Sequence, residues 1–311
     1  MHFFFRCGDR FTAHQHLDVG QFGIYKSADL AGDGGYYSSF GGFHDVNYSV
    51  RSIAHSVMLV NMPGETWPGI RAGDVTGNDG GQHHNWRHHN GAAVDVQAWE
   101  DERDALETGD ILAFEDTGDY VYVAADCTGA YIPEKLKSWT RQILYMRPSR
   151  FVILDRVEST NADYRKTWQL QAAKTPTVDG DTLTITNGDG RLFVQQLLPV
   201  DAQVSLASGD AQYQYDGKDY PLDRDPPGPL MECRVQVSPT TPSTVDYFLH
   251  VLTATDSTVD EAPGATAQIE GDEIVVSMGA SQIRFAKDEV GGSIAPDGDE
   301  RALADGIVPT E

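Results

Sequence analysis

Short segments suited to β-strands recur along this chain, most of them with apolar and polar residues in alternation. Successive side chains of a strand point to opposite faces, so a two-residue period is typical of strands. The clearest segments are 21–25, 120–123, 151–154, 192–194 and 234–237. Asp-Gly and Asn-Gly pairs favour tight turns between antiparallel strands. Such pairs separate the segments at 79–80, 90–91, 179–180, 187–188, 189–190 and 216–217.

The pattern predicts an all-β fold, a two-sheet antiparallel β-sandwich, because this many strands implies two packed sheets. No segment longer than about ten residues keeps a helical period, and 133–142 is the best candidate for a helix. We expect one domain over 1–290. Gly, Pro and acidic residues replace apolar ones from Asp288 onward, which predicts a flexible acidic tail over 291–311.

A long polar segment interrupts the strand pattern at 62–110. It is rich in Gly, Asp, His and Asn and contains Trp67, Trp86 and Trp99. A loop of this length in a compact domain is usually functional, and aromatic rings beside polar groups suit the faces of sugars. The alternative is a solvated loop whose tryptophans fold onto the sheet.

The charge balance narrows the class of partner. The 311 residues include 47 acidic and 23 basic ones, giving a net charge of −24. Phosphate binding needs a basic face, so nucleic acid is excluded as an expected partner. No apolar run approaches the roughly 20 residues of a membrane span, so no membrane partner is expected either. The composition fits a salt-rich environment or an ordinary acidic secreted protein, although the opening residues 1–6 are too short for a signal peptide.

The cysteines are widely spaced and odd in number: Cys7, Cys127 and Cys233. They predict neither a disulfide framework nor a zinc knuckle. We expect them to pack as small apolar residues.

Histidines and a carboxylate gather near the start of the chain. His14 and His16 would share one face of a strand, and Asp33 and His55 follow on neighbouring segments. A mixture of imidazoles and a carboxylate suits zinc. The alternative is a set of unrelated surface histidines.

Several segments together resemble a known family. Residues 14–25 read His-Gln-His-Leu-Asp-Val-Gly-Gln-Phe-Gly-Ile-Tyr, followed by Asp-Gly-Gly-Tyr-Tyr at 33–37 and by Tyr48, Arg51 and Ala54-His55. In order and approximate spacing they resemble the H-x-H-x-D-x-G-x-F strand and the next two motifs of heparinase II/III-like polysaccharide lyases. Segments 78–82 and 197–199 are similar to heparinase II in particular.

The resemblance implies a sandwich of the supersandwich type that cleaves uronic-acid-containing polysaccharide, of glycosaminoglycan or alginate type, by β-elimination. The partner would be an anionic polysaccharide, and the family is extracellular or periplasmic. By position, the motifs imply catalytic roles for His14 and Tyr37, substrate binding by Tyr36, Tyr48 and Arg51, and a structural zinc ion held by His16, Asp33 and His55.

One part of the family pattern is missing. The resemblance implies an α/α toroid that supplies further acid and base groups, and no segment here reads as one. We therefore expect half an active site, completed by a toroid half in cis or in trans, and leave a homo-oligomer open. Two alternatives are a non-catalytic carbohydrate-binding or structural module derived from such a lyase, and a cupin-like metal oxygenase. The second fits less well, because Asp18 follows His16 by two residues rather than four.

Overall fold

Strands dominate the structure, a computed structural model that describes residues 1–309 apart from 13, 68–74, 84–94 and 297. They make up 45% of it and helices 10%, so the predicted all-β sandwich class is confirmed. Every pairing between described strands is antiparallel, apart from one isolated parallel bridge near the C-terminus. Within the described ranges, no helix is long and apolar enough to cross a bilayer.

Two large sheets form the body of the sandwich. The seven-stranded sheet has the order β1 (His2–Phe5), β2 (Phe22–Lys26), β3 (Ala28–Ala31), β9 (Arg165–Ala172), β16 (Cys233–Pro239) and β13 (Ala202–Ser208), with β4 (Met58–Asn61) also on β9. The eight-stranded sheet has the order β10 (Thr177–Asp179), β11 (Thr182–Asn187), β12 (Gly190–Leu198), β17 (Val245–Asp256), β8 (Arg150–Ser159), β7 (Leu136–Met146), β6 (Tyr120–Asp126) and β5 (Asp110–Asp116).

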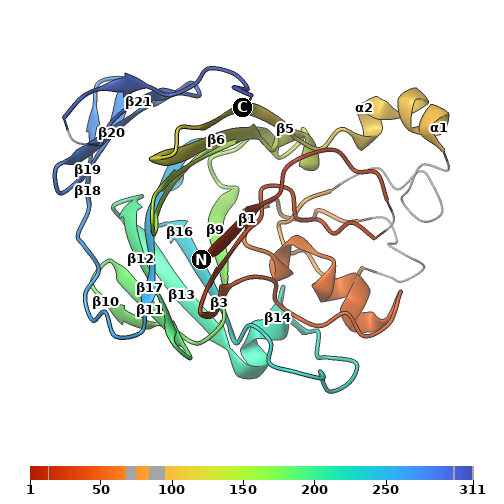
Figure 1. Ribbon diagram of the computed structural model, residues 1–311. Coiled ribbons are helices and arrows are strands. Elements are labelled where there is room, and N and C mark those ends of the chain that lie inside the picture. Colours follow the sequence, from red (N-terminus) through yellow and green to blue (C-terminus); the bar gives the residue numbers. More distant parts are fainter. Residues whose placement is uncertain (13, 68–74, 84–94, 297, 310–311) are drawn as a thin grey trace.

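A third layer covers the far face of the eight-stranded sheet (Figure 1). This five-stranded sheet comprises β18 (Thr266–Glu270), β19 (Glu273–Met278), β20 (Ser281–Ala286), β21 (Gly292–Ala295) and β22 (Arg301–Ala302). A separate hairpin pairs β14 (Gln214–Tyr215) with β15 (Lys218–Asp219). The third layer goes beyond the predicted two sheets.

The eight-stranded sheet is therefore buried on both faces and separates two cores. On β8, Phe151 and Ile153 belong to the first core, against the seven-stranded sheet, whereas Val152 and Leu154 belong to the second core, against the five-stranded sheet. Two-sided burial explains why β8 carries an uninterrupted apolar run rather than an alternation.

Two expectations about segments differ from the structure. The helix candidate at 133–142 mostly belongs to β7, which pairs along its length with β8 and from Thr140 onward also with β6. These ladders outweigh a weak helical period. The expected flexible tail at 291–311 contains β21 and β22, and Ile294 and Leu303 are buried in the second core. A boundary at residue 290 would pass through the five-stranded sheet.

The C-terminal residues also reach the edge of the eight-stranded sheet. The amide of Phe114 on β5 donates to the carbonyl of Gly306 at 3.1 Å, and the amide of Val308 donates to the carbonyl of Phe114 at 2.8 Å. Residues 306–308 thus pair with β5 through one isolated parallel bridge, between Ile307 and Phe114.

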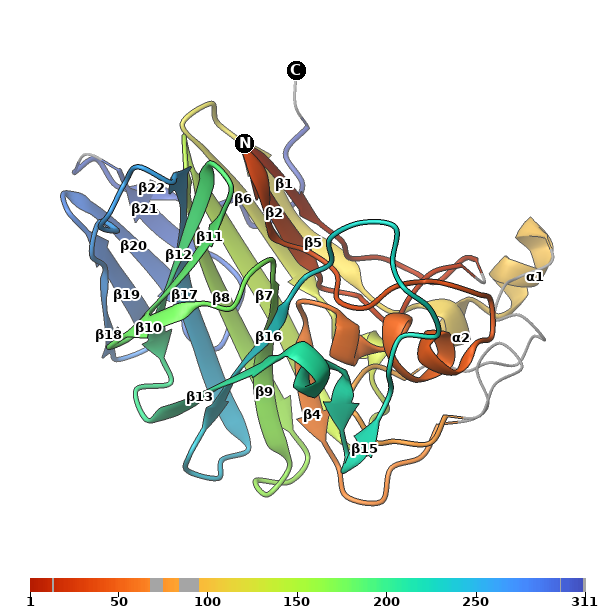
Figure 2. The ribbon, with the colours of Figure 1, turned by 90° about the horizontal axis from the view of Figure 1, so that it is seen from below.

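Irregular segments gather at one end of the sandwich (Figure 2). They include a π-helical turn η1 (Asp45–Ser49), a 3-10 turn η2 (Ser52–Ala54), and the short helices α1 (Val96–Asp101) and α2 (Arg103–Leu106). Of the predicted loop at 62–110, Trp86 lies outside the described residues, and Trp67 is buried beneath the guanidinium of Arg51, 4.1 Å from the ring centre. The alternative of a tryptophan folded inward therefore holds for Trp67.

Candidate functional site

His16, Asp33 and His55 lie together at this end of the sandwich. The imidazole rings of His16 and His55 are 5.2 Å apart, centre to centre. The Nδ1 atom of His55 is 3.0 Å from Oδ1 of Asp33, which also accepts a hydrogen bond from Gln21. The three residues come from the segment before β2, the segment after β3 and the end of η2. The sequence thus predicted three side chains that the fold brings together.

The segment that carries His14 and His16 is irregular, with a turn at His14, and is not the expected strand. The side chain of Gln15 explains it: Oε1 accepts from the amides of Phe11 and Thr12, the latter at 2.7 Å, and Nε2 donates to the carbonyl of Asp9 at 3.0 Å. A side chain that bonds its own local backbone favours a turn over a ladder. As a result His14 is exposed and His16 is half-buried.

Glutamines on β9 hold the turn that ends at His55. The amide Nε2 of Gln169 donates to the carbonyls of Ile53 at 2.9 Å and His55 at 2.7 Å, and that of Gln171 donates to Ile53 at 2.7 Å. The amide of Gly34 donates to the carbonyl of Ala54 at 2.7 Å. These bonds fix the segments of Asp33 and His55 against each other.

A buried ion pair connects the site to the eight-stranded sheet. Arg141 on β7 binds Asp155 on β8 through Nε at 2.7 Å and Nη2 at 2.9 Å. The remaining Nη1 of Arg141 donates to the carbonyls of Gly20 and Ser56, the latter at 3.1 Å. Arg141 therefore anchors both the segment after His16 and the residue after His55.

The charges of His55 and Asp33 stabilise each other. Burial alone would lower the pKa of His55, but the carboxylates of Asp33 and Asp18 raise it above its usual value. Burial alone would raise the pKa of Asp33, but the charge and hydrogen bond of His55, and the nearby His16, lower it. Each of the two groups therefore favours the charged form of the other.

The donor set suits zinc, and one donor atom is free for it. Nε2 of His55 is buried and has no hydrogen-bond partner in the part of the chain that the structure describes. Nδ1 of His55 already faces Asp33, an arrangement in which a carboxylate orients a metal-binding imidazole from behind. Among the described residues, no three His, Cys, Asp or Glu side chains are already grouped around one point as a complete metal site. Binding would need adjustment of these side chains.

Tyr48 and Arg51 lie in the interior and not at the surface, contrary to the expected substrate contact. Tyr48 is 0% exposed, stacks on His44 at 5.1 Å between ring centres, and burial raises its pKa. Arg51 is 0% exposed and is neutralised by Asp79, with Nε 3.3 Å from Oδ2. We assign both to the frame of the site, because neither side chain reaches solvent.

The accessible rim of the site consists of a histidine and aromatic side chains. His14 is exposed, and its ring lies 5.9 Å from that of Phe40. Tyr37 is 44% and Phe40 46% exposed. The half-buried Tyr36 accepts a hydrogen bond at its hydroxyl from Nη2 of the exposed Arg224, at 3.3 Å. Gly35 before it has φ 75°, and a Cβ there would lie 2.8 Å from Tyr48.

Sequence reasoning missed the residues that hold this rim. The buried His44 accepts at Nε2 from the amide of Tyr36 at 3.2 Å and donates from Nδ1 to the carbonyl of Tyr220 at 2.8 Å. Burial lowers the pKa of His44, in keeping with a neutral ring. Asp223 accepts from the hydroxyl of Ser38 at 3.1 Å. The position of His44, a fourth histidine between the motif residues, could have indicated a role at the site. No neighbouring residue in the sequence indicates a role for Asp223.

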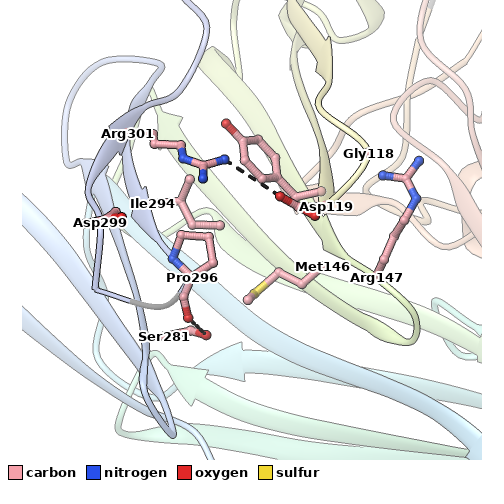
Figure 3. A pocket seen from close by; sticks show the side chains of 10 residues that line it. Gly118, Asp119, Met146, Arg147, Ser281, Ile294, Pro296, Asp299 and Arg301 are labelled. Carbon is pink, nitrogen blue, oxygen red and sulfur yellow. Dashed lines mark hydrogen bonds and ion pairs between the residues drawn. The ribbon is translucent and has the colours of Figure 1, made fainter.

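A separate cavity of about 420 Å³ lies between the five-stranded sheet and two turns of the eight-stranded sheet, from β5 to β6 and from β7 to β8 (Figure 3). None of the predicted site residues lines it. Nη1 of Arg301 is 3.8 Å from Oδ2 of Asp119, and Asp299 also lines the wall. Because its acidic and basic side chains offset one another, this cavity offers no excess positive charge to a polyanion.

Comparison with known proteins finds a likeness of fold. No family model and no curated protein matches the sequence. A solved structure described as heparinase III, the BT4657 gene product, superposes with a TM-score of 0.59 at 11% identity, over 97% of this chain and 38% of that one. The heparan sulfate lyase HepC from Pedobacter heparinus superposes with a TM-score of 0.53 at 14% identity, over 93% of this chain and 37% of that one. The chain thus has the fold of one portion of these lyases.

Proposed function

We propose that this chain is the β-sandwich part of a lyase that cleaves uronic-acid-containing polysaccharide by β-elimination. The observation that carries the proposal is the cluster of His16, Asp33 and His55 beside an accessible rim that carries His14 and Tyr37. The likeness to solved structures described as heparan sulfate lyases supports it.

The reaction defines what the rim has to do. A base takes the proton from C5 of the uronate, a double bond forms between C4 and C5, the bond from C4 to the leaving oxygen breaks, and that oxygen takes up a proton. We assign proton transfer to His14 and Tyr37, because both are exposed, and imidazole exchanges protons near neutral pH.

A cation is needed for the uronate carboxylate, because negative charge builds up at C5. The expected cation, Arg51, is buried and paired with Asp79. We assign this role to Arg224, whose guanidinium lies at the rim beside Tyr36. Arg224 also eases the approach of a polyanion to a chain with a net charge of −24.

We further propose a structural zinc ion at the cluster. His16 and His55 would hold it, with Asp33 as a ligand or as the group that orients His55. When bound, the ion would join the segments before β2, after β3 and after η2. The chemistry at the substrate stays with the rim residues.

The chain spans 37–38% of the solved lyases that it resembles. We propose that further acid and base groups come from a helical half, in cis or in trans. The main alternative is a module that binds anionic carbohydrate without cleaving it, and the burial of Tyr48 and Arg51 favours this alternative by removing two expected contacts. The cupin-like hypothesis loses its support, because neither His14 nor His16 lies on a strand.

The test combines this chain with its helical half, from the full-length gene or a neighbouring one. Formation of unsaturated uronate is followed by ultraviolet absorbance. We expect His14→Ala to lower the rate by about 10²- to 10⁴-fold. His2→Ala, at an exposed position of β1, should leave the rate unchanged. Full activity of His14→Ala would exclude His14 from the mechanism. Binding of the polymer without product would favour the binding module.

A second pair of variants tests Arg224. Arg224→Gln is expected to raise KM about tenfold, the equivalent of about 1.4 kcal/mol. Arg150→Gln, at the start of β8, is the matched control with the same loss of charge. An equal change in both variants would show that net charge alone, and not the position of Arg224, governs binding.

A further inference from the structure

Two of the three cysteines meet across the boundary between the large sheets. Cys7 follows β1, the edge strand of the seven-stranded sheet, and Cys127 follows β6 of the eight-stranded sheet. Their Sγ atoms are 3.9 Å apart although 120 positions separate them in the sequence. We propose that Cys7 and Cys127 are a site of disulfide formation, which clamps the N-terminal segment to the eight-stranded sheet.

The geometry requires only a small movement. A disulfide has its sulfurs about 2.05 Å apart, so the Sγ atoms, now 3.9 Å apart, must approach by about 2 Å. The thiol of Cys7 now lies 3.5 Å from the carbonyl of Asp126 and 3.7 Å from that of Asp110. Such contacts of a thiol are weak, so little is lost when the sulfur turns toward Cys127.

The two thiols differ in access, which sets the order of the steps. Cys7 is partly exposed, whereas Cys127 is fully buried and burial raises its pKa. The thiolate of Cys7 attacks a low-molecular-weight disulfide, forms a mixed disulfide and releases one thiol. The thiolate of Cys127 then attacks the sulfur of Cys7 and releases the second thiol. The reagent gains the two electrons that the cysteines lose, and two protons move to the released thiolates.

The bond would act on the candidate site. The amide of Gly20 donates to the carbonyl of Arg6 at 2.7 Å, and the side chain of Arg6 forms an ion pair with Asp18. A Cβ at Gly20 would lie 3.1 Å from Sγ of Cys127. The segment that follows His16 is therefore packed on Cys127 and bonded to Arg6, the residue before Cys7. A disulfide between Cys7 and Cys127 would hold the residues on which this segment packs. It would also close a loop of more than a hundred residues, which favours the folded state.

The experiment treats the full chain with oxidised glutathione and counts thiols after denaturation. We expect three free thiols before oxidation and one after it, with peptide mapping by mass spectrometry joining the peptides of Cys7 and Cys127. The oxidised protein should melt about 5 °C higher. Cys233→Ser is the matched control, since Cys233 lies on β16 in the first core, and it should still form the bond.

Cys7→Ser should abolish both the bond and the rise in melting temperature. Three thiols remaining in the oxidised wild-type chain would overturn the proposal, as would linked peptides that contain Cys233 or join two chains. Equal melting temperatures of the reduced and the bonded protein would overturn the clamp. Because the mapping uses the wild-type protein, the proposal stays testable even if a variant does not fold.

Discussion

The two cores of this protein differ in what they bury. In the first core, Arg141 and Asp155 form an ion pair among apolar side chains, with Nε of the indole of Trp139 donating to Asp155 at 2.7 Å. In the second core, apolar side chains of β8 and β17 face those of the five-stranded sheet. The contact of Tyr122 with Gln142, at 2.5 Å, is a polar exception there.

The difference follows from what lies at the end of each core. The polar groups around the first core bond to loop carbonyls: Arg141 reaches Gly20 and Ser56, and Gln169 reaches Ile53 and His55. These polar side chains therefore position the candidate site in addition to packing in the first core. At the second core, Gln142 accepts from the amide of Gly291 at 2.9 Å and Gln195 from that of Ala265 at 2.9 Å, so these side chains hold segments beside the five-stranded sheet and not the candidate site. Changes in the first core should therefore alter both stability and the site, and changes in the second core should alter stability alone.

The largest expected effect comes from breaking the buried ion pair. Arg141→Met leaves Asp155 buried without its partner, which costs about 3–5 kcal/mol of the free energy of unfolding. Urea unfolding measures it. The control is Arg284→Gln on the five-stranded sheet, where the partner Glu273, at 2.8 Å, is exposed to solvent. We expect a far smaller loss there. Similar losses in both variants would contradict the contrast between the cores.

Two substitutions that each create a cavity, one in each core, distinguish an effect on stability from an effect on the geometry of the site. Ile283→Ala in the second core and Ile53→Ala in the first each remove the same buried atoms and should cost about 3 kcal/mol. Because Ile53 belongs to the turn that ends at His55, only its variant should also weaken zinc binding. Titration with zinc checks this at a temperature where both variants are folded. Equal zinc affinities would mean that the first core does not position the cluster.

Zinc itself should stabilise the first core. At a concentration a hundred times Kd, a ligand that binds the folded chain adds about 2.7 kcal/mol to the free energy of unfolding. His55→Ala should abolish this gain, whereas His2→Ala should keep it. Thermal melts with and without zinc measure the difference. The same gain in both variants would place the metal elsewhere.

The smallest effect concerns pH and His250 in the first core. Burial, together with Arg141, lowers its pKa from 6.5 to about 3, so the folded ring stays neutral where the unfolded ring takes up a proton. The unfolded state therefore binds more protons between these values, and stability is lost as pH falls below 6.5. From pH 7 to pH 5 the loss is about 2 kcal/mol.

The variant His250→Phe tests this assignment. The ring centres of His250 and Trp168 are 3.8 Å apart. Phenylalanine would keep a ring in this stack but takes up no proton. Denaturant unfolding at pH 7 and pH 5 should show the smaller acid loss in the variant. Equal losses in both proteins would mean that His250 already titrates normally.

Sequence reasoning succeeded where the signal was local. Alternation and turn pairs predicted the strands, and the motifs predicted that His16, Asp33 and His55 meet. It failed where a contact was distant or a side chain bonded its own backbone. Gln15 made a turn of an expected strand, and Asp223 reaches Ser38 across 185 positions.

The burial of individual side chains was the second property that the sequence did not predict. Arg51 has the residue type expected for an anionic substrate, but Asp79, 28 positions later, neutralises it inside the protein. The charge of a residue alone does not distinguish a substrate contact from a member of a buried ion pair. Likewise, the apolar run on β8 fits any strand with two covered faces, so the third sheet could not be read from it.

The C-terminal segment beside β5 bears on how this protein avoids aggregation. An open strand edge presents free amides and carbonyls that can pair with another molecule. Residues 306–308 occupy part of that edge on β5, next to the acidic Asp305. The opposite edge strand, β10, is three residues long. The eight-stranded sheet thus has one edge that its own chain covers in part and another whose strand is only three residues long, and both features limit pairing with a neighbouring molecule.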